Sequence, residues 1–414
     1  MKIWHVSIYE PLPWIKEKNR RMRVGLLAKA LATRGHQTEI WLPTFEHIKK
    51  QQVFLESCKV KINKQISVQY LKSIPYKFDI SLKRYFHNLF LACEFRKVAE
   101  TKKRLPDGII AQVPSLELAH ACIEFAKKNK IPVFLDIRDL YPDNYKRIIP
   151  DFLKKWFSII FCKQINQIKN MLLDSKAVFV ISKSYQAWVE NQVQPRKVKC
   201  YVFPLGCDQK RRKRTSKNDC FFKKYQIPKN KKLISFAGTF SSCYDFSFLA
   251  QASYLIEKKF TNQFHFVLAG VGELHKKTLN QISQLKNISL PGWLPADELD
   301  ILYQKSYIGL APYSANAEMS LPNKFFEFLK YNLPMACSLH GEMGEIIETE
   351  NIGKVFSSSN ETSFLTALKT ISKKYLVMKK NLLRLQKEYD TDKIYLSFAT
   401  KIEQEVCEYD PRSV

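Results

Sequence analysis

The sequence has no hydrophobic run long enough to span a membrane. Its longest apolar stretches, around Trp156–Cys162 and Leu89–Cys93, fall far short of the roughly 18 residues that a spanning helix needs. The first residues, Met1–Ile8, lack the basic and long apolar segments of a secretory signal, and they predict a first strand instead. We therefore expect a cytoplasmic protein, or one that is peripheral on the inner face of the cell membrane.

Closely paired cysteines are also missing. The ten cysteines occur singly, without a CxxC pair of the kind that ligates zinc or forms a redox couple. No suitably spaced cluster of acids, histidines and cysteines replaces such a pair. The sequence therefore predicts reduced, mostly buried cysteines, no metal site and no bound cofactor.

Acidic residues are scarce relative to basic ones. The chain has 67 Lys and Arg against 39 Asp and Glu, a formal net charge of +28. This excess predicts a polyanionic partner, and nucleic acid, anionic lipid headgroups and phosphorylated substrates all qualify. Zinc-finger, helix-turn-helix and RNP-type motifs are absent, which argues against nucleic acid. A non-enzymatic protein that binds polyanions through charge alone is an alternative.

Length and alternation predict two domains. A chain of 414 residues with 45% hydrophobic and 26% charged residues exceeds one ordinary core. Two series of short β-branched or aromatic runs alternate with helical segments, which is typical of mostly parallel sheets. The predicted boundaries are an N-terminal domain (1–206), a polar basic linker without a periodic apolar face (207–231), a C-terminal domain (232–390) and a C-terminal helix crossing back to the first domain (391–414).

The most informative segment is Ser320–Pro334. Pro322 stands at the mouth of a predicted helix, Asn323 and Lys324 lie in its first turn, and Glu327 follows one turn later. A lysine there opposes the helix dipole at a cost of up to about 1 kcal/mol, which a bound anion would relieve. The alternative is that Lys324 extends into solvent.

Three predicted strands of the second series end in glycine. They lead into Gly238-Thr239, Gly270 and Gly292-Trp293-Leu294. Glycine permits the close approach either of a ligand or of another backbone. Trp293 is a candidate wall for a nucleotide base, with core packing as the alternative.

Charged residues follow a buried strand of the first series. Asp136, Arg138 and Asp139 lie at a strand's carboxyl end, where substrate groups bind in such folds. We consider them candidate catalytic residues, together with Lys324 and Glu327; a self-satisfied Asp–Arg network is the competing interpretation. Arg20 and Arg23 open a helix and either meet an acceptor phosphate or form a solvated face.

Together these segments resemble the GT-B glycosyltransferases of family 4, particularly the subgroup that builds bacterial O-antigen and capsular polysaccharides. The resemblance covers nearly the whole chain. It rests on EPLP near residue 10, RxxRxG (20–25), RGHQTEIW (34–41), DIRDLYPD (136–143), VISKS (180–184), FPLGCD (203–208), LAGVGE (268–273), PGWLP (291–295) and, most specifically, LPNKFFEFLKYNLP (321–334).

The resemblance implies a fold and an activity. The expected fold is α/β, with two Rossmann-like doubly wound domains facing a central cleft. The implied activity is metal-independent retaining transfer by a hexosyltransferase (EC 2.4), from a nucleotide sugar, most simply a UDP-sugar, to a lipid-linked or saccharide acceptor in surface polysaccharide biosynthesis. A GT-B-fold sugar-nucleotide 2-epimerase, with added acid and base carboxylates, is the alternative.

The resemblance also implies residue roles. Glu327 would bind the ribose, Asn323 and Lys324 the diphosphate, Gly238 and Thr239 the phosphates, and Gly292–Leu294 the base. The chain departs from the family where an acid often stands eight positions before Glu327: that position is Met319, with Glu318 beside it as the candidate replacement in the donor site.

Two stretches of the first domain predict a membrane-facing surface. Tyr76–Lys103 and Tyr145–Lys169 both mix apolar aromatic side chains with lysines and arginines, as interfacial helices do. We therefore expect an anionic membrane surface as a partner. The alternative is that both segments bury their apolar residues against the sheet.

Overall fold

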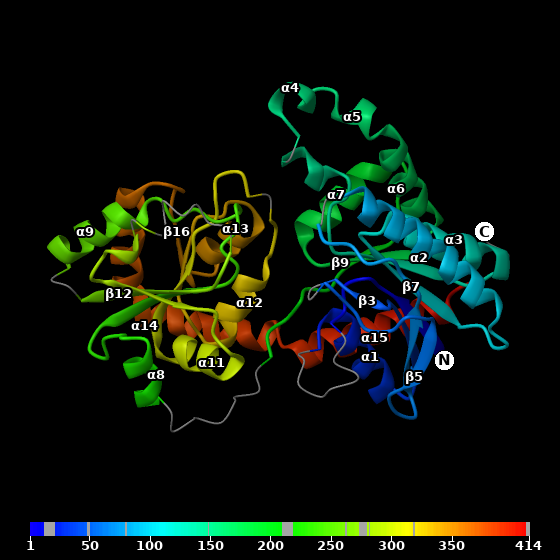
Figure 1. Ribbon diagram of the computed structural model, residues 1–414, viewed down its shortest axis with the longest axis horizontal. Coiled ribbons are helices and arrows are strands. Elements are labelled where there is room, and N and C mark those ends of the chain that lie inside the picture. The colour runs from blue at the N-terminus through cyan, green and yellow to red at the C-terminus, as the bar shows by residue number, and fades with distance from the viewer. Residues whose placement is uncertain are drawn as a thin grey trace. The chain divides into compact units, whose positions relative to one another are not determined.

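The computed structural model divides into two compact units (Figure 1). Unit 1 comprises Met1–Leu205 and Asp392–Val414, and unit 2 comprises Gly206–Thr391. The structure describes residues 1–11, 21–47, 50–78, 81–147, 149–208, 218–260, 263–272, 280, 282–317 and 319–410.

Unit 1 is built on an eight-stranded sheet with the order β10-β9-β8-β7-β1-β2-β6-β5. All neighbouring strands pair in parallel except β5, which is antiparallel to β6. The strands are β1 (Lys2–Val6), β2 (Gln37–Pro43), β5 (Cys58–Lys61), β6 (Ile66–Leu71), β7 (Gly108–Val113), β8 (Val133–Ile137), β9 (Ala177–Val180) and β10 (Cys200–Val202), with a separate hairpin of β3 (Phe45–Glu46) and β4 (Gln51–Gln52).

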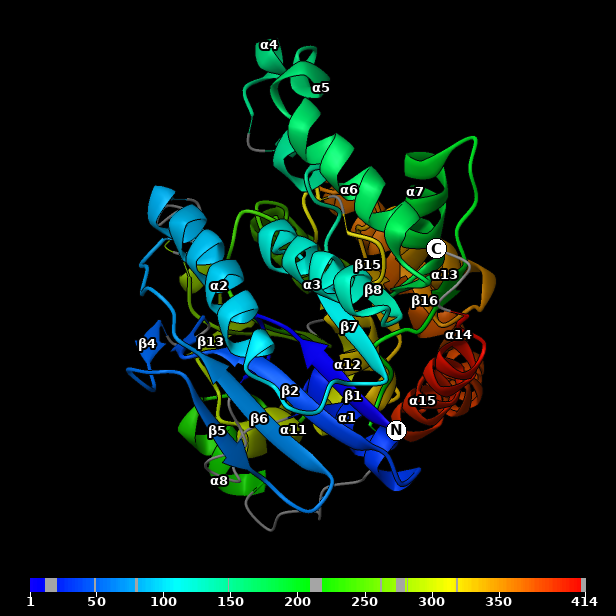
Figure 2. The same cartoon turned by 90° about the vertical axis from the view of Figure 1, so that its right-hand side faces the viewer.

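Helices cover both faces of this sheet. Alternate strand residues point to opposite faces, so Trp4 packs in the core under α2 and α3, and Ile3 packs in the core under α1 and α15. Figure 2 shows α2 and α3 side by side over the sheet. The helices are α1 (Arg23–Thr33), α2 (Leu82–Glu100), α3 (Leu116–Asn129), η1 (Asp143–Arg147), α4 (Asp151–Lys154), α5 (Phe157–Ile160), α6 (Cys162–Asp174), α7 (Lys183–Val193) and α15 (Thr391–Cys407).

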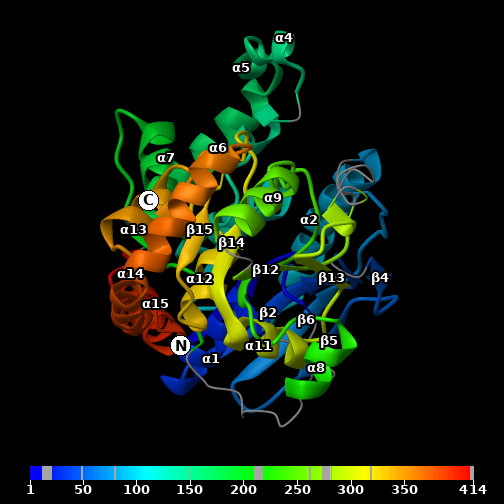
Figure 3. The ribbon, with the colours of Figure 1, turned by 90° about the vertical axis from the view of Figure 1, so that its left-hand side faces the viewer.

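Unit 2 is a second, six-stranded parallel sheet with the order β13-β12-β11-β14-β15-β16, seen in Figure 3. Together the two sheets confirm the predicted doubly wound α/β fold. The elements are β11 (Lys232–Ala237), β12 (Phe264–Ala269), β13 (Ile288–Gly292), β14 (Ser306–Ala311), β15 (Met335–Cys337), β16 (Gly353–Val355), α8 (Asn218–Lys224), α9 (Leu249–Lys259), α11 (Ala296–Lys305), α12 (Asn323–Lys330), α13 (Glu342–Thr349) and α14 (Glu361–Glu388).

Two local expectations are wrong. The segment predicted as a linker without an apolar face contains α8, where Phe221 and Phe222 are adjacent and both buried. All ten cysteines are free, but only Cys122, Cys207 and Cys337 are buried, so most are not core residues. Within the described part of the chain, no helix is both long and apolar enough to cross a membrane.

Candidate functional site

In unit 2, helix α12 places its first lysine against the end of strand β11. The Lys324 side chain is only 7% exposed, and its Nζ lies 5.2 Å from the ring centroid of Phe236. A Cβ on Gly238 would lie 3.4 Å from this Nζ. Lys324 therefore does not extend into solvent, and its ammonium lies beside the loop that the sequence predicted to face phosphates.

Glu327 holds the ammonium in place. Its Oε2 accepts from Lys324 Nζ at 2.8 Å and from the Tyr303 hydroxyl at 3.4 Å. Burial, and then the nearby Glu327 charge, raise the pKa of Tyr303 well above its ordinary value, so this phenol stays a proton donor. Sequence reasoning missed Tyr303, because a tyrosine on α11 is indistinguishable from an ordinary core aromatic.

The beginning of α12 is open to an anion. Pro322 is the N-cap residue, and no side chain caps the helix. Proline suits this position because its ring fixes φ where no N–H is needed. Asn323 is exposed, so the first-turn amides of α12 and the Lys324 ammonium form one positive region at the helix start.

Gly270, which follows β12, allows two backbone segments to approach closely. A Cβ on Gly270 would overlap the Gly238 carbonyl oxygen, so the close approach is to another backbone rather than to a ligand. The Gly238 N–H donates to Ala269 O at 2.9 Å, and the Gly270 N–H donates to Gly292 O at 2.8 Å. The Gly238 N–H is therefore already used within the sheet, whereas Thr239 beside it is exposed.

The predicted base-binding residues separate into two environments. Trp293 is 66% exposed and is not packed in the core. Leu294 is 6% exposed, so its side chain is part of the core. Glu318 lies outside the described residues.

In unit 1, Asp136 and Arg23 bind each other. Arg23 Nε lies 2.9 Å from both carboxylate oxygens, its Nη2 lies 2.8 Å from Oδ1, and its Nη1 donates to Phe203 O at 2.6 Å. Both side chains are completely buried. Burial alone would raise the pKa of Asp136, but the Arg23 guanidinium holds it below its usual value.

This pair corrects two expectations. Neither Asp136 nor Arg23 is accessible to a substrate or an acceptor phosphate, because both side chains are completely buried and bonded to each other and to Gln112 and Phe203 O. The structure agrees with the predicted alternative in that an aspartate and an arginine pair with each other. The arginine, however, comes from α1 and not from the same loop as Asp136. Arg20 lies outside the described residues.

Asp139 has a different environment, because it lines a pocket of about 610 Å³ in unit 1. Arg84 binds the Tyr9 hydroxyl beside it. Burial raises the pKa of Glu117 and also that of Tyr145, which keeps both groups more protonated than usual. The lining includes Tyr9, His47, Arg84, Tyr85, Asn88, Ser115, Glu117, Asp139, Tyr141, Asn144 and Tyr145.

Only part of this pocket could be predicted from the sequence. Asp139 was predicted from its place after β8, but Arg84 and Glu117 come from the beginnings of α2 and α3, where single charges carry no motif. Arg138 lies between the two environments. Its backbone N–H donates to Val113 O at 3.0 Å, and its Nη1 is buried.

Solved structures of low sequence identity share this fold along nearly the whole chain. Sucrose-phosphate synthase from Thermosynechococcus elongatus is 13% identical, with a TM-score of 0.71, over 99% of this chain and 100% of its own. Anabaena HepE in complex with UDP-glucose is 13% identical, with a TM-score of 0.64, over 98% and 100%. WaaG, a glycosyltransferase involved in lipopolysaccharide biosynthesis, is 12% identical, with a TM-score of 0.62, over 96% and 98%.

Sequence comparison finds one similarity, which lies within the second unit. No curated protein matches the chain. Residues 231–374 match the family model described as Glycosyl transferases group 1, and this range contains β11, α12 and the paired side chains of Lys324 and Glu327. The chain therefore has the GT-B fold, and residues 231–374 of its unit 2 are similar to the glycosyl transferases group 1 family.

Proposed function

We propose that this protein is a retaining, metal-independent glycosyltransferase of the hexosyltransferase type. It moves a sugar from a nucleotide sugar to a lipid-linked or saccharide acceptor in surface polysaccharide biosynthesis. The observation that carries the proposal is the Lys324 ammonium, fixed by Glu327 against the end of β11 at the uncapped start of α12. This arrangement offers a positive charge and the backbone amides of Asn323 and Lys324 to a diphosphate.

The donor is proposed to be a UDP-sugar, since the similar Anabaena protein was solved with UDP-glucose. Lys324 and the first-turn amides at Asn323 would bind the diphosphate. Glu327 would accept from the ribose hydroxyls with its remaining acceptor capacity, and exposed Trp293 would stack on the base. No cofactor takes part.

The transfer reaction requires mainly electrostatic stabilisation from the protein. The bond from the sugar's anomeric carbon to the diphosphate oxygen breaks, and a bond to the acceptor oxygen forms on the same face. The proton of the acceptor hydroxyl passes to the departing diphosphate. Lys324 stabilises the negative charge that develops on that diphosphate, a role that a fixed cation in a protected site performs well.

The acceptor is proposed to bind in the 610 Å³ pocket of unit 1. Tyrosine rings offer flat apolar faces to sugar rings, while Arg84 and Asp139 offer charged groups to hydroxyls and phosphates. Both kinds of contact line the same pocket.

A panel of UDP-, GDP- and dTDP-sugars tests the assignment. The true donor at about 100 times its dissociation constant should stabilise the folded protein by about 2.7 kcal/mol, measured as a shift in thermal unfolding. Incubation with that donor and acceptor should then release nucleoside diphosphate. Release of an isomerised donor without acceptor would instead identify an epimerase, and no stabilisation by any member would contradict a nucleotide-sugar site.

Metal removal is expected to leave activity unchanged, because Lys324 and the start of α12 supply the positive charge that a metal ion would otherwise provide. Transfer should continue at the same rate in EDTA. Loss of transfer in EDTA with recovery on adding magnesium or manganese would disprove this part of the proposal.

Unit 1 also has an exposed apolar surface that supports docking on an anionic membrane. Phe157 of α5 is buried, as the alternative interpretation expected, but its neighbours remain exposed: Phe152 (70%), Trp156 (50%), Ile159 (64%) and Ile160 (50%). At the start of α2, Leu82 and Phe86 are exposed as well. Residues of α2 and of the segment leading into α4 line the same pocket, so the two exposed groups flank the proposed acceptor site.

We expect a double substitution on α5 to weaken membrane binding. Ile159→Ser/Ile160→Ser removes two exposed aliphatic side chains that would enter the lipid interface. In sedimentation with vesicles of acidic phospholipid, the variant should remain largely in the supernatant while the wild-type protein pellets. The matched control is Leu376→Ser/Val377→Ser on α14, an aliphatic pair in unit 2 that is at least as exposed. Equal recovery of wild-type protein with acidic and neutral vesicles would contradict membrane docking.

A further inference from the structure

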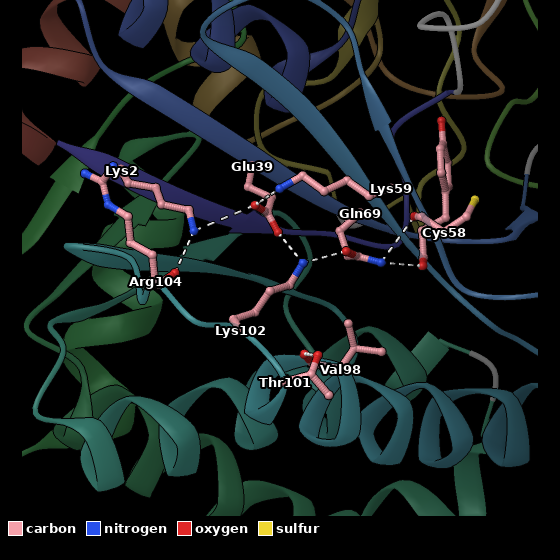
Figure 4. Close-up of polar contacts among 10 residues, drawn as sticks. Lys2, Glu39, Cys58, Lys59, Gln69, Val98, Thr101, Lys102 and Arg104 are labelled. Carbon is pink, nitrogen blue, oxygen red and sulfur yellow. Dashed lines mark hydrogen bonds and ion pairs between the residues drawn. The ribbon is translucent and has the colours of Figure 1, made fainter.

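Lysines gather around one buried carboxylate near the amino ends of β1 and β2 in unit 1. Figure 4 shows Glu39 of β2 between Lys59 of β5, Lys2 of β1 and Lys102, which follows α2. The ammonium of Lys59 lies 2.7 Å from the carboxylate, that of Lys102 lies 2.8 Å away, and that of Lys2 lies 3.8 Å away. Glu39 itself is only 2% exposed.

Further hydrogen bonds fix Lys2 and Lys102, two of the lysines around Glu39. Lys2 Nζ donates to the carbonyl oxygen of Arg104 at 2.7 Å, and Lys102 Nζ donates to Gln69 Oε1 at 2.6 Å (Figure 4). Gln69 is held in turn, because its Nε2 donates to Cys58 O and Tyr70 O. The positive charges are therefore built into the sheet edge and are not only mobile surface groups.

The cluster opens into a pocket of about 420 Å³. Its lining adds Lys61 and Lys64, which are exposed and have no acidic partner among the residues that the structure describes. Glu39 is the only acid in the lining, and the other polar members are Gln37, Thr38, Asn63, Gln65 and Ser67.

Positive charge exceeds negative charge at this site. The only other acid bonded to these residues in the described part of the chain is Asp107, which is exposed and accepts from the backbone N–H of Lys2 at 2.6 Å. Burial lowers the pKa of Lys2; Glu39 raises it, but Lys59, Lys102 and Arg104 lower it again. Like charges therefore crowd a half-buried site, and an anion would relieve their repulsion.

We propose that this pocket binds a small phosphate-bearing anion. Lys59, Lys61 and Lys64 contact the phosphate oxygens, while Glu39 with Lys2 and Lys102 forms the fixed base of the site. The site is separate from the proposed acceptor pocket, because Lys2 and Glu39 lie near the amino ends of β1 and β2, whereas Asp139 follows the carboxyl end of β8. It does not depend on the proposed transfer activity.

The test is lysine footprinting of the full chain with pyrophosphate as the probe. Limited acylation followed by mass spectrometry reports each lysine separately, so binding here is distinguished from binding at Lys324. Pyrophosphate should slow acylation of Lys59, Lys61 and Lys64 several-fold and leave exposed Lys369 and Lys373 of α14 unaffected. Even protection of all surface lysines, or protection by phosphatidic acid vesicles but not by pyrophosphate, would overturn the proposal.

Charge variants test the same site in both directions. Lys61→Gln/Lys64→Gln should weaken pyrophosphate binding by roughly tenfold, measured by the protection of Lys59 from acylation, since each nearby charge changes affinity several-fold. Glu39→Gln, which removes the one acid of the lining, should tighten it. The matched control is Lys369→Gln/Lys373→Gln, with the same net charge change in unit 2. An equal loss in the control and the Lys61/Lys64 variant would show that only net charge matters and would overturn the site.

Discussion

Replacing Lys324 by methionine is expected to reduce kcat/KM for sugar transfer by roughly two to three orders of magnitude, the usual effect of removing one group that stabilises charge in a transition state. Methionine keeps the apolar stem packed against Phe236 and removes only the ammonium. Glu327→Gln should also lose activity, because a neutral amide no longer fixes the ammonium at 2.8 Å. Initial rates of nucleoside diphosphate release measure both effects.

The matched control lies on the same helix. Lys330 is in the last turn of α12, where its Nζ is 3.7 Å from Asp300. Lys330→Met changes the charge equally but at the opposite end of the helix, so its activity should stay near that of the wild type. Near-normal turnover of Lys324→Met, with donor binding still saturable, would refute the donor assignment and leave the fold unaffected.

Breaking the Arg23–Asp136 pair is expected to destabilise unit 1 by about 3–5 kcal/mol. Asp136→Ala leaves the completely buried Arg23 guanidinium without its counter-charge. The double variant Arg23→Met/Asp136→Leu should recover most of that loss, because it leaves no buried charge unpaired. Denaturant unfolding followed by tryptophan fluorescence reports on unit 1, which contains five of the six tryptophans of the chain.

The pair also has a predictable pH dependence. Since Arg23 lowers the pKa of Asp136 in the folded state, the stabilisation is present above the unfolded-state pKa and is lost as the pH falls through the folded-state value. The double variant should therefore lose less stability on acidification than the wild-type protein. If Asp136→Ala unfolded at the same denaturant concentration as the wild type, the pair would have no structural role.

The sequence predicted the alternation of strands and helices well, because buried parallel strands are short continuous apolar runs. It missed β5, whose residues Cys58–Lys61 alternate with lysines and look like a loop. It also did not separate the buried Phe157 from its exposed neighbours in the stretch around Trp156. There the chain forms two helices of four residues each. Such short helices show no helical period in the sequence, so the burial of Phe157 could not be predicted.

The candidate site residues differ in how far away in the sequence their partners lie. Lys324 and Glu327 are one turn apart, so their pairing follows from local helix geometry, and the structure shows it. Arg23 and Asp136 are 113 residues apart, and nothing in a single sequence connects them. The sequence therefore placed Asp136 correctly at a strand end but assigned it a ligand contact in place of an internal partner.

The return of α15 to unit 1 affects the order in which the protein can be made. Phe398 and Ile402 of this helix belong to the same core as Ile3 and Phe134, and the Phe398 ring lies 4.9 Å from the Arg23 guanidinium. Unit 1 thus contains both the first and the last residues of the described chain, whereas unit 2 is continuous in sequence. During synthesis on a ribosome, unit 2 is complete before unit 1 receives α15. The domain that is translated first is therefore the one that finishes folding last.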